Sequence, residues 1–166
     1  MMTNLNFISS FSLNRMYNLP NVCRHCNCAE ENYAHCFLFC KVSTLVYTYF
    51  THLLRQLVDA DLTIEEKAFG LPINNLLDKR ERLRNYITSC VKCVIFRNRA
   101  FIWNGNLNTK SSILIYKCKK FLASDLSSKF INFKSKKCID KFNEIFLIDN
   151  ILGTVTSNVF RFSTNI

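Results

Sequence analysis

The sequence predicts a mainly α-helical domain, with a small cysteine-rich segment followed by a bundle of amphipathic helices. With 166 residues, 49% of them apolar, the chain can bury the core of one ordinary domain, and it is too apolar to be disordered. Only 3 Gly and 2 Pro occur, which disfavours a turn-rich β-sandwich or barrel. Downstream of the cysteines, apolar residues recur at helical spacing.

The first two predicted helices follow the cysteine-rich segment directly. Ser43 to Asp59 carries an apolar stripe with a repeating four-residue step, which predicts an amphipathic helix. Thr63 followed by Glu66 is a capping-box pattern, so a short helix is expected to continue through Phe69. Gly70 then supplies a C-terminal stop.

A long helix is predicted from Leu76 to Trp103. Asn75 is the expected cap, and the carboxylate of Asp78 in the first turn complements the positive end of the helix dipole. Asn104, Gly105 and Asn106 are expected to end the helix.

Two further helices are predicted over residues 112–133 and 136–147. The tail from Leu152 to Phe162 alternates apolar and polar residues too weakly to predict a strand. The expected organisation is an N-terminal segment (1–18), a cysteine-rich knuckle (19–42), a helical domain (43–148) and a C-terminal tail (149–166).

The expected compartment decides how the 9 cysteines are interpreted. No segment approaches the roughly 20 apolar residues that span a bilayer, so no membrane association is expected. The N-terminus lacks the basic and continuous apolar regions of a secretory signal. An intracellular location is therefore expected, in which disulfides are rare and clustered cysteines favour metal binding.

Five cysteines lie within eighteen residues, and four side chains there follow the pattern C-x2-C-x8-H-x4-C: Cys23, Cys26, His35 and Cys40. Three soft thiolates and one imidazole in a four-coordinate shell select Zn²⁺. Such a shell leaves no position for water. One structural zinc ion, without hydrolytic chemistry, is therefore predicted.

The ligand assignment has local alternatives. Cys28 or Cys36 could replace a neighbouring ligand, and all five cysteines could simply be core residues. His25, between the paired cysteines, is expected to be exposed and not a ligand. Asn27 tolerates the left-handed backbone that a knuckle turn often needs.

Of the remaining cysteines, Cys90, Cys93 and Cys118 are expected to be core residues, and Cys138 is not assigned. Cys90 and Cys93 form a second C-x2-C, but it lies inside a predicted helix, where core packing is favoured. A second metal site with Cys118 or Cys138 is the alternative.

The segment NVCRHCNCAEENYAHCFLFC resembles the zinc-binding region found C-terminal to reverse transcriptases of non-LTR retrotransposons of the RTE or jockey type. The matching features are the Cys and His spacing, the acidic pair Glu30 and Glu31, and the apolar flank Phe37 to Phe39. NYITSCVKCVIFRNRAFIWNG, at 85–105, resembles the long helix of the same region.

This resemblance implies a non-catalytic appendage detached from its polymerase. The chain has neither the Tyr-x-Asp-Asp turn of a polymerase nor a Pro-Asp…Asp/Glu-x-Lys nuclease core, so no catalytic residues are assigned. The polymerase portion of the parent protein is then a possible partner of this region.

Charge predicts a second function. Residues 79–141 carry sixteen basic and three acidic side chains, whereas the flanking parts are slightly acidic. Such a face suits binding to RNA or DNA, with a solvated lysine-rich surface as the alternative. The expected contact residues are Arg97, Arg99, Lys117, Lys119, Lys120, Lys134, Lys136 and Lys137.

Two alternatives omit nucleic acid altogether. One is a zinc-stabilised structural or protein-interaction module, and the other is a decayed open reading frame without a selected function.

Overall fold

The structure, a computed structural model, describes residues 10–28, 30–70, 78–99 and 107–163. The fold is mainly α, as the sequence predicts, with one short hairpin near the C-terminus. The elements are α1 (Ser10–Tyr17), the π-helical turn η1 (His35–Phe39), α2 (Lys41–Leu57), α3 (Ile64–Phe69), α4 (Lys79–Arg97), α5 (Leu107–Ser135), α6 (Ile139–Phe146), the 3-10 turn η2 (Ile148–Asn150), β1 (Gly153–Thr156) and β2 (Val159–Phe162).

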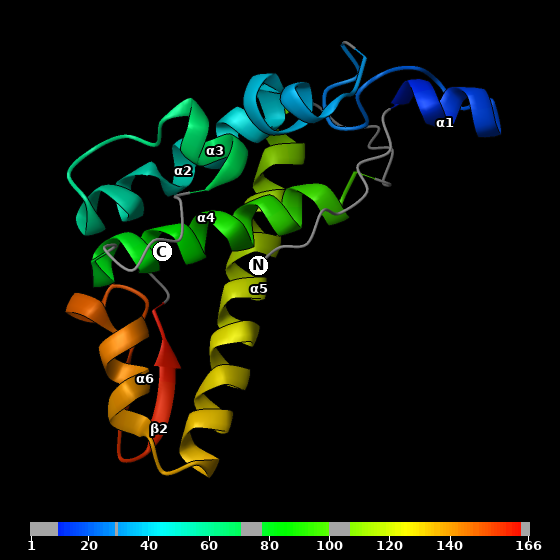
Figure 1. Ribbon diagram of the computed structural model, residues 1–166. Helices are drawn as coiled ribbons and strands as arrows, with labels where there is room; N and C mark the ends of the chain where they lie inside the picture. Colours follow the sequence, from blue (N-terminus) through cyan, green and yellow to red (C-terminus); the bar gives the residue numbers. More distant parts are fainter. Residues whose placement is uncertain (1–9, 29, 71–77, 100–106, 164–166) are drawn as a thin grey trace.

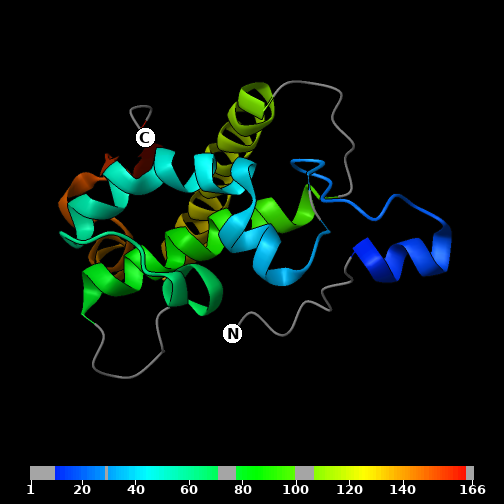
Figure 2. The ribbon, with the colours of Figure 1, turned by 90° about the horizontal axis from the view of Figure 1, so that it is seen from above.

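Helices α2, α4 and α5 pack against one another and form the centre of the molecule. Helix α2 packs against α5, and η1 contacts α2, α3 and α4. Figure 1 shows α6 and the hairpin beside the second half of α5, away from α2, α3 and η1. Helix α1 extends away from this bundle in both ribbon views (Figures 1 and 2). The metal-ligand candidates thus lie at one end of the bundle.

Helix α2 buries one continuous stripe, which explains why it forms where the four-residue step predicts it. Val42, Val46, Phe50 and Leu54 are all buried in the common core. The helix begins at Lys41, two residues earlier than expected, directly after Cys40.

Helix α3 confirms the predicted capping box. The Thr63 hydroxyl accepts from the Glu66 amide at 3.1 Å, and the Glu66 carboxylate accepts from the Thr63 amide at 2.7 Å. Gly70 ends the helix with φ of 78°. The positive φ favours glycine at this position, and a Cβ here would also displace the side-chain oxygen of Asn85, 2.7 Å away.

Helix α4 begins later than predicted. Asp78, in an extended conformation, caps the helix, and its carboxylate accepts from the amides of Arg80 and Glu81. The predicted start at Leu76 is therefore wrong, because Asp78 is the cap and not a first-turn residue. The expected cap Asn75, the end at Trp103 and the stop at 104–106 lie outside the described residues.

Helix α5 is longer than predicted and α6 is shorter. Helix α5 ends at Ser135, and the left-handed Lys137 (φ 55°) separates it from α6, which begins only at Ile139. The predicted helix over 136–147 therefore starts too early by three residues.

The C-terminal tail forms a hairpin that the sequence pattern did not reveal. Thr156 pairs with Val159, and the two residues between them, Ser157 and Asn158, both have positive φ. The turn contains no glycine, which is the usual signal of this geometry. The ring of Phe160 on β2 packs within 6.0 Å of Phe130 on α5, centre to centre, so the hairpin belongs to the core.

Among the described residues, no helix combines the length and the apolar character that a membrane crossing requires.

Candidate metal centre and basic surface

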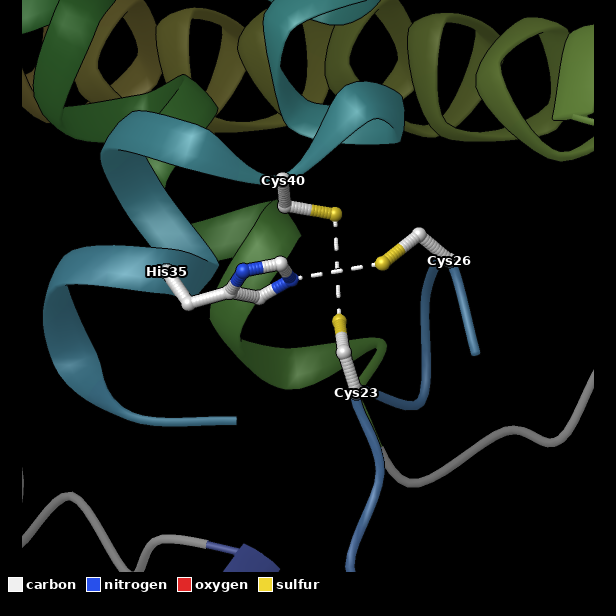
Figure 3. A group of neighbouring side chains, drawn as sticks. All are labelled: Cys23, Cys26, His35 and Cys40. Atoms are coloured by element: carbon white, nitrogen blue, oxygen red, sulfur yellow. Dashed lines mark hydrogen bonds between the residues drawn. The ribbon is translucent and has the colours of Figure 1, made fainter. Parts of the chain in front are cut away.

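Four side chains converge at the front of α2, as the C-x2-C-x8-H-x4-C pattern predicts. The ligand atoms of Cys23, Cys26, His35 and Cys40 all lie within 4.8 Å of one another. Figure 3 shows the three sulfur atoms and the imidazole directed toward one common point. The two first cysteines come from the loop before η1, His35 from η1, and Cys40 from the junction of η1 with α2.

Two distances within this cluster are close to those of a four-coordinate metal site. Zn–S bonds of about 2.3 Å at tetrahedral angles separate two sulfur ligands by about 3.8 Å. The Sγ atoms of Cys23 and Cys40 are 3.8 Å apart. Cys26 Sγ lies 3.2 Å from His35 Nε2, slightly shorter than a zinc-bound pair requires. The donor set and its geometry therefore fit a closed four-ligand shell for a metal ion.

Local hydrogen bonds explain how a short segment brings these ligands together. The Asn27 amide donates to the Cys23 carbonyl at 2.7 Å, and Asn27 adopts the expected left-handed conformation (φ 57°). The side chain of Asn32 accepts from the His35 amide at 2.8 Å at the start of η1. The Cys40 amide donates to the His35 carbonyl at 2.7 Å, which closes the π-helical turn between two ligands.

Hydrogen bonds favour the thiolate form of Cys40. A hydrogen bond from the Cys23 thiol lowers the pKa of Cys40 to about 5, and the backbone amides of Ser43 and Val42 at the start of α2 act in the same direction. The pKa of Cys23 is raised because it shares that hydrogen bond and is buried. The start of α2 therefore stabilises a thiolate at the ligand position that the sequence assigns to Cys40.

The two neighbouring cysteines do not join the cluster. Cys28 is exposed, and its thiol donates to the Cys26 carbonyl at 3.0 Å. Cys36 is fully buried in the core, and burial raises the pKa of its thiol. The structure therefore favours the four ligands predicted from the spacing over Cys28 and Cys36.

His25 is not a member of the cluster, but the expectation that it is exposed is wrong. The ring is buried, and burial lowers its pKa. Because a carbonyl oxygen can only accept, Nε2 donates to the carbonyl of Ile95 at 3.0 Å. The Nδ1 atom is buried without a hydrogen-bond partner. His25 therefore connects the knuckle to the last turn of α4.

An ion pair makes a second connection at the same place. Glu31 Oε1 lies 2.8 Å from Nε and 2.7 Å from Nη2 of Arg99, just after α4. Glu31 is fully buried and Arg99 is 8% exposed. The charge pattern did not reveal this role, because it assigns Arg99 to the basic surface. The acidic pair Glu30 and Glu31 is the signal in the sequence that could have indicated a buried partner for a basic residue.

Three of the distant cysteines, Cys90, Cys93 and Cys118, are buried as predicted. Cys138 stands at the N-cap position of α6, is half-buried, and its thiol donates to the Lys136 carbonyl. Within the described part of the chain, no second group of cysteine, histidine or acidic side chains converges as the first does. The three buried cysteines therefore pack as core residues, and the alternative of a second metal site finds no support there.

The basic residues predicted to contact nucleic acid fall into two groups along α5. The first group lies near the end of α4 and in the first half of α5: Arg97, Lys117, Lys119 and Lys120. The second lies at and beyond the end of α5: Lys134, Lys136 and Lys137. Seventeen helical residues separate Lys117 from Lys134, a distance of about 26 Å. One short ligand segment therefore contacts only one group.

Not every predicted contact residue is available. Arg99 is buried in its pair with Glu31, so its assignment to the basic surface is wrong. Lys117 donates to the side-chain oxygen of Asn98, and Lys134 donates to the Asn158 carbonyl at 3.0 Å. Five of the predicted contact residues are exposed, and Lys117 and Lys119 are half-buried; the exposed ones are Arg97, Lys120, Lys134, Lys136 and Lys137.

Comparisons with protein-family models, curated proteins and solved structures found no match to this chain. The resemblance to retrotransposon proteins therefore rests on the motif residues alone.

Proposed function

We propose that this chain is a non-catalytic, zinc-stabilised helical domain that binds RNA or DNA through its basic helices. The zinc part of the proposal is supported by the convergence of Cys23, Cys26, His35 and Cys40 on one point. The nucleic-acid part is supported by the sixteen basic side chains of residues 79–141. The motif resemblance adds the proposal that the domain derives from the region C-terminal to a non-LTR retrotransposon reverse transcriptase. The polymerase portion of such a protein is then a candidate partner.

Zinc would act here as a structural ion. Four protein ligands fill its shell, so it would supply folding free energy and no open position for catalysis. The conformation of the loop and of η1 would depend on zinc, because these segments carry the ligands. Through His25 and Glu31, the loss of zinc would also affect the contacts with the end of α4.

Metal content tests the first half of the proposal. Protein purified in zinc-containing, reducing buffer is expected to hold one zinc per chain, measured by elemental analysis. The double variant Cys23→Ser plus Cys40→Ser is expected to lose it. Cys28→Ser is the matched control and should keep the full amount, because Cys28 is exposed and outside the cluster. Zinc-free wild type, or zinc retained by the double variant, would contradict the proposal.

Salt dependence tests the second half. Affinity for a labelled oligonucleotide of mixed sequence should fall steeply with salt, with a slope of log K against log [salt] of about −3 for four phosphate contacts on a single strand. Two triple charge-reversal variants compare the contributions of the two basic groups to affinity, and both change the net charge equally. One reverses Lys117, Lys119 and Lys120, and the other reverses Lys134, Lys136 and Lys137. Absence of binding at low salt would exclude the polyanion function.

A protein-interaction module is the second candidate function. Phe39 in η1 and both Ile64 and Phe69 in α3 are large apolar side chains exposed to solvent, and η1 and α3 contact each other. Under this alternative, the wild type and both triple charge-reversal variants bind the oligonucleotide only at background level.

A further inference from the structure

Two exposed tyrosines lie beside the first basic group. Tyr49 on α2 is 43% exposed and Tyr116 on α5 is 63% exposed. The Lys119 ammonium lies 5.0 Å from the centre of the Tyr49 ring, which places α5 and α2 in contact here. We call Tyr49, Tyr116, Lys119 and Lys120 the tyrosine–lysine surface.

The helical period places the α5 members of this surface together. Tyr116, Lys119 and Lys120 are separated by three and four residues, so they share one side of the helix. Tyr116 and Lys120 lie on its exposed stripe, while Lys119 reaches toward α2. The surface therefore combines two rings with two cations where α5 lies against α2.

A second cation–ring pair borders the same stripe from the other side. The Arg97 guanidinium carbon lies 5.6 Å from the centre of the Phe121 ring. Phe121 and Lys119 are two residues apart, so they point about 200° apart around α5. The exposed stripe with Tyr116 and Lys120 thus lies between one cation–ring pair on α2 and another on α4.

Charge complementarity indicates the occupant of this surface. No Asp or Glu occurs between Glu81 and Asp125, and α2 contains none either. The surface thus combines cations and aromatic rings and draws no carboxylate from α2 or the first half of α5. An acidic polymer that also presents flat rings matches both properties.

We propose that the tyrosine–lysine surface binds single-stranded nucleic acid, with unpaired bases stacked on Tyr116 and Tyr49 and phosphates held by Lys119 and Lys120. Stacking on aromatic side chains is available to every base when its face is exposed. A duplex hides those faces and can contact only the cations. This inference rests on the proposed nucleic-acid function and specifies its ligand class.

The test compares single-stranded RNA, single-stranded DNA and duplex DNA of one sequence at one low salt concentration, by fluorescence anisotropy with the zinc-loaded chain. Tyr116→Ala is expected to weaken single-strand binding by about 5- to 150-fold, the effect of losing one stacked base. Duplex binding should stay within about twofold of wild type. The RNA and DNA arms show which strand is preferred.

Two control variants isolate the ring. Tyr116→Phe keeps the ring and should keep single-strand affinity. Ile131→Ala removes another exposed apolar side chain from the second half of α5 and should change nothing. Tyr49→Ala provides a second, independent loss of a stacking ring. Zinc content of each variant reports that the fold is retained.

The outcomes separate this inference from the proposed function. If neither Tyr116→Ala nor Tyr49→Ala weakens single-strand binding while Lys119→Glu plus Lys120→Glu abolishes it, the stacking role is overturned and the nucleic-acid function stands. Equal losses for single strand and duplex would also overturn it. If no oligonucleotide binds to wild type at low salt, the proposed function itself fails.

Discussion

Glu31 and Arg99 are 68 residues apart in the sequence and form a buried ion pair, with 2.7 Å between Glu31 Oε1 and Arg99 Nη2. The hydrogen bond from His25 to Ile95 joins the same two segments. The knuckle is thereby fixed to the end of α4, from which Arg97 reaches the ring of Phe121 on α5. The candidate metal centre and the basic surface are thus connected through one helix end.

Breaking this ion pair should destabilise the protein strongly. Glu31→Ala leaves Arg99 buried without its partner, and the expected loss in the free energy of unfolding is about 3–5 kcal/mol. The double variant Glu31→Leu plus Arg99→Met removes both charges and should lose less than Glu31→Ala alone. Urea unfolding of the zinc-loaded protein measures both values.

Asp61→Asn is the control, since it breaks the exposed pair between Arg55 and Asp61. This change should have little effect on stability. The role of the Glu31–Arg99 pair would be contradicted if the double variant lost more free energy of unfolding than Glu31→Leu and Arg99→Met lose together as single variants.

Thiol reactivity should distinguish buried from exposed cysteines. Burial raises the pKa of both Cys90 and Cys118 to about 12, and only the thiolate reacts with iodoacetamide. In the folded, zinc-loaded protein, Cys28 should be labelled while these two stay unlabelled up to about pH 10. Mass spectrometry of peptides after labelling identifies the modified residues.

The same shifts predict a loss of stability at alkaline pH. Because the folded-state pKa of Cys90 and Cys118 lies above the unfolded value of 9.0, these thiols favour the folded state fully below about pH 9. Their contribution declines as the pH rises toward 12. Cys118→Val removes one titrating thiol and should reduce the slope of stability against pH in this range. An unchanged slope would contradict the assignment.

Helix α4 should depend on the cap at Asp78. Asp78→Ala removes the acceptor for the amides of Arg80 and Glu81 and should lower stability by about 1 kcal/mol. Asp78→Ser keeps a side-chain acceptor and should retain most of the stability that the cap contributes. A greater loss with Asn75→Ala than with Asp78→Ala would show that the helix starts where the sequence pattern alone places it.

The aromatic core between α5, α6 and the hairpin should be sensitive to truncation. The fully buried Phe142 ring lies 5.3 Å from the Phe130 ring and 5.5 Å from the Phe160 ring, centre to centre. Phe142→Ala should therefore lower the free energy of unfolding by about 3–5 kcal/mol. Ile145→Ala on the exposed face of the same helix is the matched control, and thermal unfolding compares the two. Equal effects would exclude the packing described here.

Local patterns were sufficient for most of the helices and for the four convergent side chains. The ligand set lies within eighteen residues, so its spacing and a single left-handed residue, Asn27, nearly determine how the side chains meet. The capping box at Thr63 and Glu66 is likewise a contact between residues three positions apart. Each of these features depends on neighbours in sequence, which is why the sequence reveals it.

Features that depend on distant partners were missed. The hairpin at 153–162 has a turn without glycine, and Phe160 supports it through contacts with α5 and α6. His25 and Arg99 are polar, and no periodicity predicts that both are buried at one junction.

The helical class, the ligand spacing and the amount of positive charge follow from the residues and their order alone. Which charges remain at the surface depends on the fold, because Glu31 neutralises Arg99 while Lys120 stays exposed. It also placed Tyr49 beside Lys119 across two helices. A buried charge needs a partner to offset its lost hydration, and only the fold determines whether that partner is within reach.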